Sequence, residues 1–132
     1  MHDVVYFRRP DSGVMPGRDY LKTLPTKVRA TMVACLMAVA EAPPKRFAGG
    51  GYWEAMHGEM TGWFEVRVDG KDRMHHRLFC RLDYEAKGHD KPLLVVIAGM
   101  SKPFRTRFAT SDYASVRELG EEYYAQNPRS IG

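Results

Sequence analysis

The chain has 132 residues with 20 basic and 16 acidic side chains, and its formal net charge at pH 7 is +4. This length fits one compact domain, and a hydrophobic content of 44% with a charged content of 27% excludes an intrinsically disordered chain. The segment 67–107 holds ten basic and five acidic residues, so the excess positive charge lies in one part of the sequence, which favours an anionic partner.

Membrane, secreted and metal-binding proteins fit this sequence poorly. Its longest apolar runs, residues 32–40 and 92–100, are shorter than the roughly 20 residues of a membrane-spanning helix. The first ten residues carry charges where a signal peptide has its apolar core. Cys35 and Cys80 lie far apart without a metal-binding spacing, which is typical of reduced thiols in the cytoplasm. We therefore expect a single cytoplasmic domain, residues 1–132, with no metal, cofactor or membrane.

The N-terminal third predicts a strand followed by two helices. Val4–Phe7 is a short β-branched and aromatic run, and residues 16–24 have the pattern of a short helix that Pro25 ends. A second helix is expected from Pro25 or Thr26 to about residue 42, where Pro43 and Pro44 follow. Its apolar residues recur every three or four positions and predict a buried stripe of Val28, Met32, Cys35, Leu36, Val39 and Ala40.

Residues 47–62 show no helical or strand periodicity. The glycine run 49–51 lacks the lysine and serine of a phosphate-binding P-loop, and no apolar strand precedes it. We therefore expect an irregular connector here.

From residue 63 the pattern alternates, as in strands with one buried face. Residues 63–68 and 74–82 predict two strands joined at Asp69-Gly70, a hairpin signal. The core face of this hairpin is predicted to hold Phe64, Val66, Val68, Leu78, Cys80 and Leu82. The opposite face is predicted to hold Trp63, Glu65, Arg67, His75, Arg77, Phe79 and Arg81.

The last third predicts a buried strand, a basic loop and a helix. Residues 93–98 are continuously apolar, as expected of a strand covered on both faces, and residues 99–107 read as a basic loop. A final helix, capped by Thr110, Ser111 or Asp112, is expected to end near Tyr124, and 126–132 are expected to form a flexible tail. The predicted fold is α+β, with an N-terminal strand and a helical hairpin packed on a mostly antiparallel twisted sheet and a C-terminal helix.

Basic side chains gather on the second face of the predicted hairpin and in the loop that follows the last strand. Several guanidinium groups that converge in this way favour a bound anion, for which phosphate is the natural candidate. The candidate site comprises Arg67, Arg77, Arg81, Lys102, Arg105 and Arg107, with Glu65 or His75 as a general base and Trp63, Phe79 and Phe104 as surfaces for base stacking. The alternative is a set of ordinary exposed arginines, in which Glu65 pairs with Arg67 or Arg77.

Three segments resemble the RelE/HigB-like toxins of type II toxin–antitoxin systems, in the family's order, over about residues 4–125. They are Tyr20–Pro25 (YLKTLP) before the helical hairpin, Trp63–Val68 (WFEVRV) with Arg77–Cys80 (RLFC) in the paired strands, and Lys102–Thr106 (KPFRT) after the apolar strand. This resemblance implies a RelE-like fold and a metal-independent endoribonuclease that cleaves mRNA, on the ribosome, by attack of the 2′-hydroxyl on the adjacent phosphate. It makes Arg67 and Arg77 the central stabilisers of the transition state, with Lys102 and Arg105 as clamps on the RNA backbone.

Two other functions remain open at this stage. One is a ParE-like toxin on the same fold that poisons DNA gyrase without cleaving a substrate, and the other is a catalytically inactive relative that binds RNA or a partner protein. In each toxin reading the resemblance also implies a cognate antitoxin, often of the helix-turn-helix type.

Overall fold

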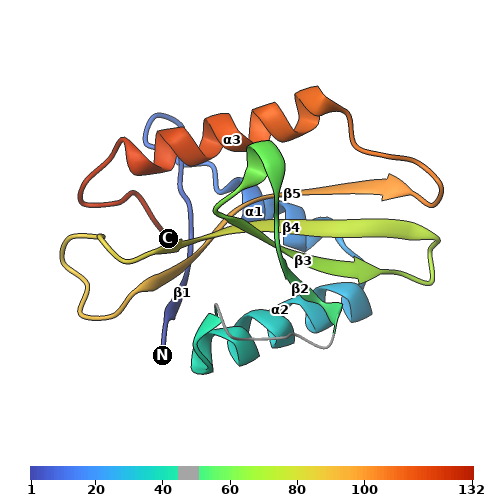
Figure 1. Ribbon diagram of the computed structural model, residues 1–132, viewed down its shortest axis with the longest axis horizontal. Helices are drawn as coiled ribbons and strands as arrows, with labels where there is room; N and C mark the ends of the chain where they lie inside the picture. The colour runs from blue at the N-terminus through green and yellow to red at the C-terminus, as the bar shows by residue number, and fades with distance from the viewer. Residues whose placement is uncertain (45–50) are drawn as a thin grey trace.

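A five-stranded mixed sheet lies between helices in the computed structural model, which describes residues 1–44 and 51–132 (Figure 1). The strands are β1 (Asp3–Tyr6), β2 (Trp53–Ala55), β3 (Trp63–Asp69), β4 (Met74–Asp83) and β5 (Leu93–Pro103). The helices are α1 (Pro16–Thr23), α2 (Thr26–Glu41), the short 3₁₀ helix η3 (Gly58–Met60) and α3 (Thr110–Tyr124). The strand order is β1-β5-β4-β3-β2, in which β1 runs parallel to β5 and every other pair is antiparallel. The expected α+β fold class is confirmed.

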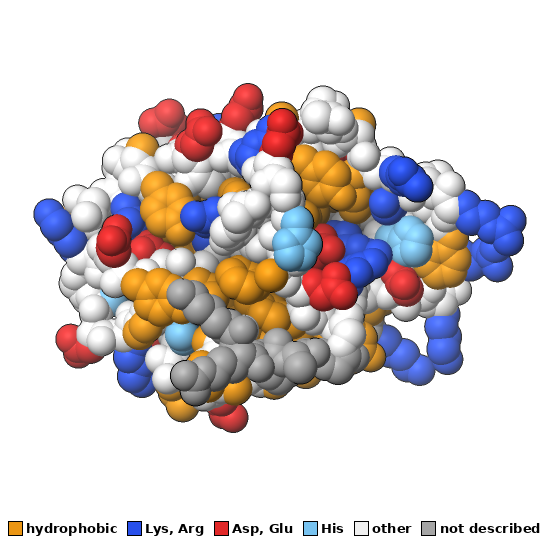
Figure 2. Space-filling model, in the orientation of Figure 1, with side chains coloured by type: hydrophobic (Ala, Val, Ile, Leu, Met, Phe, Trp, Pro, Cys, Tyr) orange, Lys and Arg blue, Asp and Glu red, His pale blue; other side chains and the backbone are white. Residues whose placement is uncertain are grey.

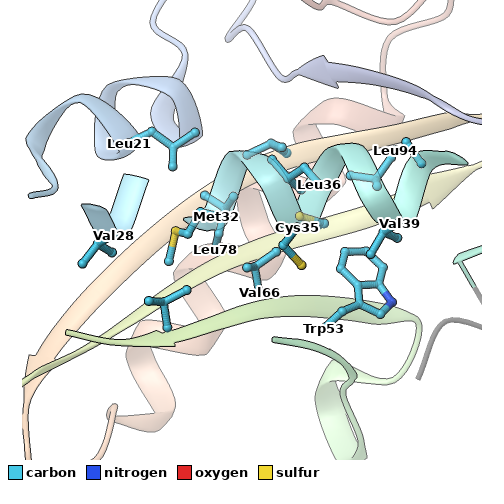
Figure 3. Close-up of a cluster of buried hydrophobic side chains, with 14 of the residues drawn as sticks. Leu21, Val28, Met32, Cys35, Leu36, Val39, Trp53, Val66, Leu78 and Leu94 are labelled. Carbon is cyan, nitrogen blue, oxygen red and sulfur yellow. The ribbon is translucent and has the colours of Figure 1, made fainter. Parts of the chain in front are cut away.

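One face of the sheet packs against α2. The predicted apolar stripe of this helix is buried, and it meets the core face of the hairpin in one continuous cluster (Figure 3). Val66 and Leu78 lie directly opposite each other in the β3–β4 register, and both are fully buried beneath the helix. The alternation of apolar residues therefore predicted this face correctly.

The other face of the sheet is half covered by α3, which runs across it (Figure 1). Val116 and Tyr123 of the helix are buried in a second cluster with Phe79 and Trp63. Gly120 permits this close packing, because a Cβ atom there would lie 2.5 Å from the Trp63 ring. α3 begins only at Thr110, and the ends of β3 and β5 and the start of β4 extend beyond it.

The segment expected to be an irregular connector contains regular structure. β2 pairs with β3 over three residues, with Trp53 opposite Val66, and η3 begins after two further residues. The part of this prediction that falls on residues 47–50 lies outside the described residues. Three residues of strand give too few alternations for a sequence pattern, so only the pairing with β3 reveals β2.

The chain also differs from expectation after β5 and at its end. β5 continues to Pro103, so Gly99–Lys102 belong to a strand and the basic loop begins at Phe104. The C-terminal residues, expected to form a flexible tail, pair with the first strand: the Gly132 amide donates to the Tyr6 carbonyl over 2.9 Å. No helix in the described residues is long and apolar enough to span a membrane.

Buried Asp83, the last residue of β4, anchors the C-terminal segment. It accepts hydrogen bonds from Nε of Arg129 at 2.8 Å and from the Tyr123 hydroxyl at 2.7 Å. Burial alone would raise the pKa of Asp83, but these hydrogen bonds and one from the Glu85 amide hold it below its ordinary value. The pairing accounts for the buried carboxylate, since an unpaired charge there would be strongly destabilising.

Candidate nucleic-acid interface

The candidate site occupies the part of the sheet that α3 leaves open. Basic, acidic and histidine side chains gather right of centre on this face, below the N-terminal half of α3 (Figure 2). They come from the alternate positions of β3 and β4 that the sequence placed on the second face, and from the end of β5. The site lies where α3 begins and where the loop 104–109 leaves the sheet.

Arg67 is held by two carboxylates. Its Nη1 lies 2.7 Å from the Glu54 carboxylate on β2, and its Nε lies 3.5 Å from the Glu65 carboxylate on its own strand. Arg67 also stands directly opposite Arg77 in the β3–β4 register. Two like charges face each other there, and the carboxylates offset their repulsion.

Arg77 is more buried than the sequence indicated. It was expected on an exposed strand face, yet the residue is only 7% exposed, because β4 lies between β3 and β5. Its Nη1 donates to Asp69 at 3.2 Å and to the His76 carbonyl at 3.0 Å. These contacts fix the guanidinium in one orientation, which is a property that electrostatic catalysis requires.

Glu65 lies at the centre of this cluster of cations. Burial raises the pKa of its carboxyl above the ordinary value, while the charges of Arg67 and Arg77 oppose that rise. The Tyr113 ring of α3 reaches the same face, because its centre lies 6.1 Å from that of Phe79, the residue opposite Glu65 in the β3–β4 register. Burial and then the Glu65 charge raise the Tyr113 pKa. A carboxylate of raised pKa beside fixed cations has the properties of a general base.

Lys102 supplies a cation of a different kind. Its Nζ lies 4.3 Å from the centre of the Phe108 ring, and within the described part of the chain it makes no salt bridge. Burial and then the charge of Arg77 lower the Lys102 pKa. Its ammonium therefore keeps its hydrogen-bonding capacity for a ligand, whereas the two central arginines already have protein partners.

The rings of His75 and Phe104 lie against each other at the end of the sheet, with their planes tilted by 41°. Their ring centres lie 4.7 Å apart, and Nδ1 of His75 lies 2.6 Å from Oδ1 of Asp69. The Arg73 guanidinium lies over the Phe104 ring, with its carbon atom 5.9 Å from the ring centre. Among the three aromatic residues predicted to stack with bases, only Phe104 is partly exposed at the site.

The predictions for Trp63 and Phe79 as stacking surfaces are wrong. They are 5% and 0% exposed, because α3 packs on them. Arg81, predicted to bind RNA, also lies under α3 rather than in the open cluster. Its guanidinium lies 5.2 Å from the ring centres of both Trp63 and Tyr124, and its Nε donates to the Tyr124 hydroxyl at 3.3 Å.

Arg105 and Arg107 are exposed in the loop that follows β5. Arg107 is close enough for its charge to contribute to the lowered pKa of Lys102. Arg105 has a φ of 65°, in the left-handed region that side chains other than glycine rarely adopt, so the loop turns sharply at this residue. The structure therefore brings together Glu65, Arg67, Arg77, Lys102 and Arg107, with His75 and Phe104 beside them.

Sequence reasoning missed Glu54, Asp69 and Tyr113 as members of the site. Glu54 escaped notice because β2 has no detectable pattern, and Asp69 because the Asp-Gly pair reads as a turn signal alone. Tyr113 had a usable signal: with Val116, Gly120 and Tyr123 it follows the spacing of the buried face of α3.

Within residues 1–44 and 51–132 no three His, Cys, Asp or Glu side chains are placed to hold a metal ion together. Comparisons of this chain with protein-family models, with curated proteins and with solved structures give no match.

Proposed function

We propose that this protein is an endoribonuclease that cleaves mRNA, most effectively on the ribosome, as a toxin of the RelE/HigB kind. The observation that carries the proposal is that Glu65 of β3, Arg77 of β4 and Lys102 of β5 share the open half of one face of the sheet. A guanidinium fixed by two hydrogen bonds, with an ammonium nearby and a partly buried carboxylate, suits the cleavage of a phosphodiester by its own 2′-hydroxyl.

In the proposed step, Glu65 takes the proton of the RNA 2′-hydroxyl as its oxygen attacks the adjacent phosphorus. The bond from phosphorus to the 5′-oxygen breaks, and Lys102 donates a proton to the departing oxygen. The products are a 2′,3′-cyclic phosphate and a 5′-hydroxyl, so no oxidant or second substrate enters the reaction. Arg77 donates to the phosphoryl oxygens, on which negative charge accumulates in the transition state.

Arg67 has a positioning role in this scheme. Its contacts with Glu54 and Glu65 hold the base in place, and its charge limits the rise in the Glu65 pKa. Arg105 and Arg107 lie on the exposed loop, where they bind the RNA backbone on either side of the cleaved bond. Phe104 and His75 offer a surface on which a neighbouring base can stack.

The test compares Lys102, on β5, with Lys91, an exposed lysine two residues before the other end of the same strand. Lys102→Ala should lower the rate of cleavage by about 10²-fold, the effect of losing one preorganised donor. Lys91→Ala, just before the opposite end of β5, should stay within about twofold of the wild type. Rates are measured on purified protein with labelled mRNA, free and bound to ribosomes. Equal rates for both variants would contradict the assignment of the site.

Binding of the backbone has a separate readout in its salt dependence. Replacing Arg105 and Arg107 together by alanine should reduce the slope of log affinity against log salt by up to about two units, since each phosphate contact contributes roughly 0.7–0.9. An unchanged slope would place the RNA backbone elsewhere on the protein.

A further inference from the structure

A hollow of about 330 Å³ lies between η3 and the first half of α3. It is next to the proposed catalytic cluster, which comprises Glu65, Arg77 and Lys102. It is lined mainly by Met56, His57, Glu59 and Met60 from the segment after β2, and by Tyr113 and Arg117 from α3. The proposed cleavage step gives this hollow no role.

The hollow borders the site through Tyr113. This residue lines the hollow, and its ring centre lies 6.1 Å from that of Phe79, the residue opposite Glu65 in the β3–β4 register. β2 provides a second link, because Glu54 contacts Arg67 and the chain reaches the rim of the hollow at Met56, two residues later. Two extended residues span about 7 Å, so a base held in the hollow is the neighbour of a phosphate held at the cluster.

The walls combine apolar surfaces with one adjacent donor and acceptor. The thioethers of Met56 and Met60 and the ring of Tyr113 can pack on a flat ring system. Nη2 of Arg117 lies 3.6 Å from the Glu59 carboxylate, beyond the usual length of a strong hydrogen bond. Among the described residues, Nη1 has only the Met60 sulfur as a partner, at 3.7 Å. The Glu59 side chain is 75% exposed, so both charged groups can turn to a ligand.

Guanine is the base whose hydrogen-bonding edge matches the guanidinium of Arg117 and the carboxylate of Glu59. Its O6 accepts hydrogen bonds from a guanidinium, and the adjacent N1–H and N2–H groups donate to a carboxylate. Adenine has a donor where guanine has O6, so it would face the Arg117 donor. It has an acceptor where guanine has N1–H, so it would face the Glu59 carboxylate, and neither contact could form. The pyrimidines fill less of the apolar walls.

We propose that this hollow binds a guanine base next to the cleaved phosphate, with Arg117 donating to O6 and Glu59 accepting from N1–H and N2–H. The inference rests on the proposed RNA cleavage and adds its sequence preference. Glu59 and Arg117 are then the residues that determine specificity.

The experiment maps the 5′-hydroxyl ends that purified protein generates from a pool of random RNA. Wild-type protein should favour guanine over adenine at one fixed position beside the cut by roughly 10- to 100-fold, the range of one good two-point contact to a base. Glu59→Gln and Arg117→Ala should each lose most of this preference while cutting the adenine-containing RNAs at nearly the wild-type rate. Glu118→Gln removes the same charge from an exposed position of α3 and should leave the preference intact.

The outcomes separate the two proposals. Wild-type protein that cuts neither this pool nor mRNA bound to ribosomes would overturn the proposed function and this inference with it. Cleavage without a guanine preference, or a preference that survives in the Glu59 and Arg117 variants, would overturn the guanine site alone. Circular dichroism of each variant confirms that it is folded, and Arg117→Lys, which keeps the charge and much of the packing, should show an intermediate preference.

Discussion

Arg77→Lys separates the geometry of the guanidinium from its charge. Arg77 donates through Nη1 to both Asp69 and the His76 carbonyl, and a lysine retains the charge without the planar fork. We expect the free energy of unfolding to fall by about 1–2 kcal/mol, because one hydrogen bond to a charged group is weakened. Since small domains are stable by about 5–15 kcal/mol, the variant stays folded at 25 °C. Its cleavage rate should nevertheless fall by about 10²–10³.

Alanine is a poorer choice at this position. Burial of the Arg77 side chain means that Arg77→Ala loses about 0.8 kcal/mol for each buried methylene, together with the hydrogen bonds to Asp69 and to the His76 carbonyl. The combined loss, about 3–5 kcal/mol, would mix unfolding with any catalytic effect.

Arg129→Lys is the matched control. Arg129 is also buried and also pairs with a carboxylate, Asp83, but it lies at the C-terminal end of the fold, away from the site. Chemical denaturation and single-turnover cleavage are measured for both variants. We expect similar losses of stability and a normal rate for Arg129→Lys. If Arg77→Lys cleaves at the wild-type rate, or if both variants slow equally, Arg77 does not stabilise the transition state.

Three further outcomes follow from other parts of the structure. Because burial raises the Glu65 pKa, kcat/KM should decline as the pH falls through a value above the ordinary 4.3 of a glutamate, and Glu65→Gln should remove this decline together with most of the activity. Gly120→Ala should lower the free energy of unfolding by about 1–2 kcal/mol, because the new methyl group meets the buried Trp63 ring and this strain outweighs the gain in helix propensity. The pKa of Asp83 is lower in the folded protein than in the unfolded chain, where it is near 3.9, so the ionised side chain stabilises the fold above that pH. The difference in the free energy of unfolding between wild type and Asp83→Asn should therefore be constant from about pH 5 to 7 and shrink as the pH falls below about 4. Urea titrations across this pH range measure the last two effects.

The alternation of residues in the β3–β4 hairpin was enough to predict which side chains share a face. Leu78 and Cys80 lie against α2, and His75 and Arg77 lie on the other face, as the sequence indicated. A period of two residues fixes this division whatever the rest of the chain does.

The coverage of that second face could not be predicted in the same way. Whether Phe79 is open to a base depends on where α3 crosses the sheet, which is a tertiary contact without a local sequence signal. The burial of Arg77 has the same origin, because it follows from the interior position of β4 in the sheet order. Glu54 joins the site only through the pairing of β2 with β3.

The chemical identity of the RNA ends decides whether this protein cleaves RNA through the 2′-hydroxyl. A defined mRNA is incubated with purified protein, with and without ribosomes, and the fragments are analysed by mass spectrometry. We expect 5′ fragments that end in a 2′,3′-cyclic phosphate and 3′ fragments that begin with a 5′-hydroxyl, and both should form about 10²-fold more slowly when Lys102→Ala replaces the wild type. Intact RNA in every reaction, or fragments with 5′-phosphate ends, would contradict this mechanism.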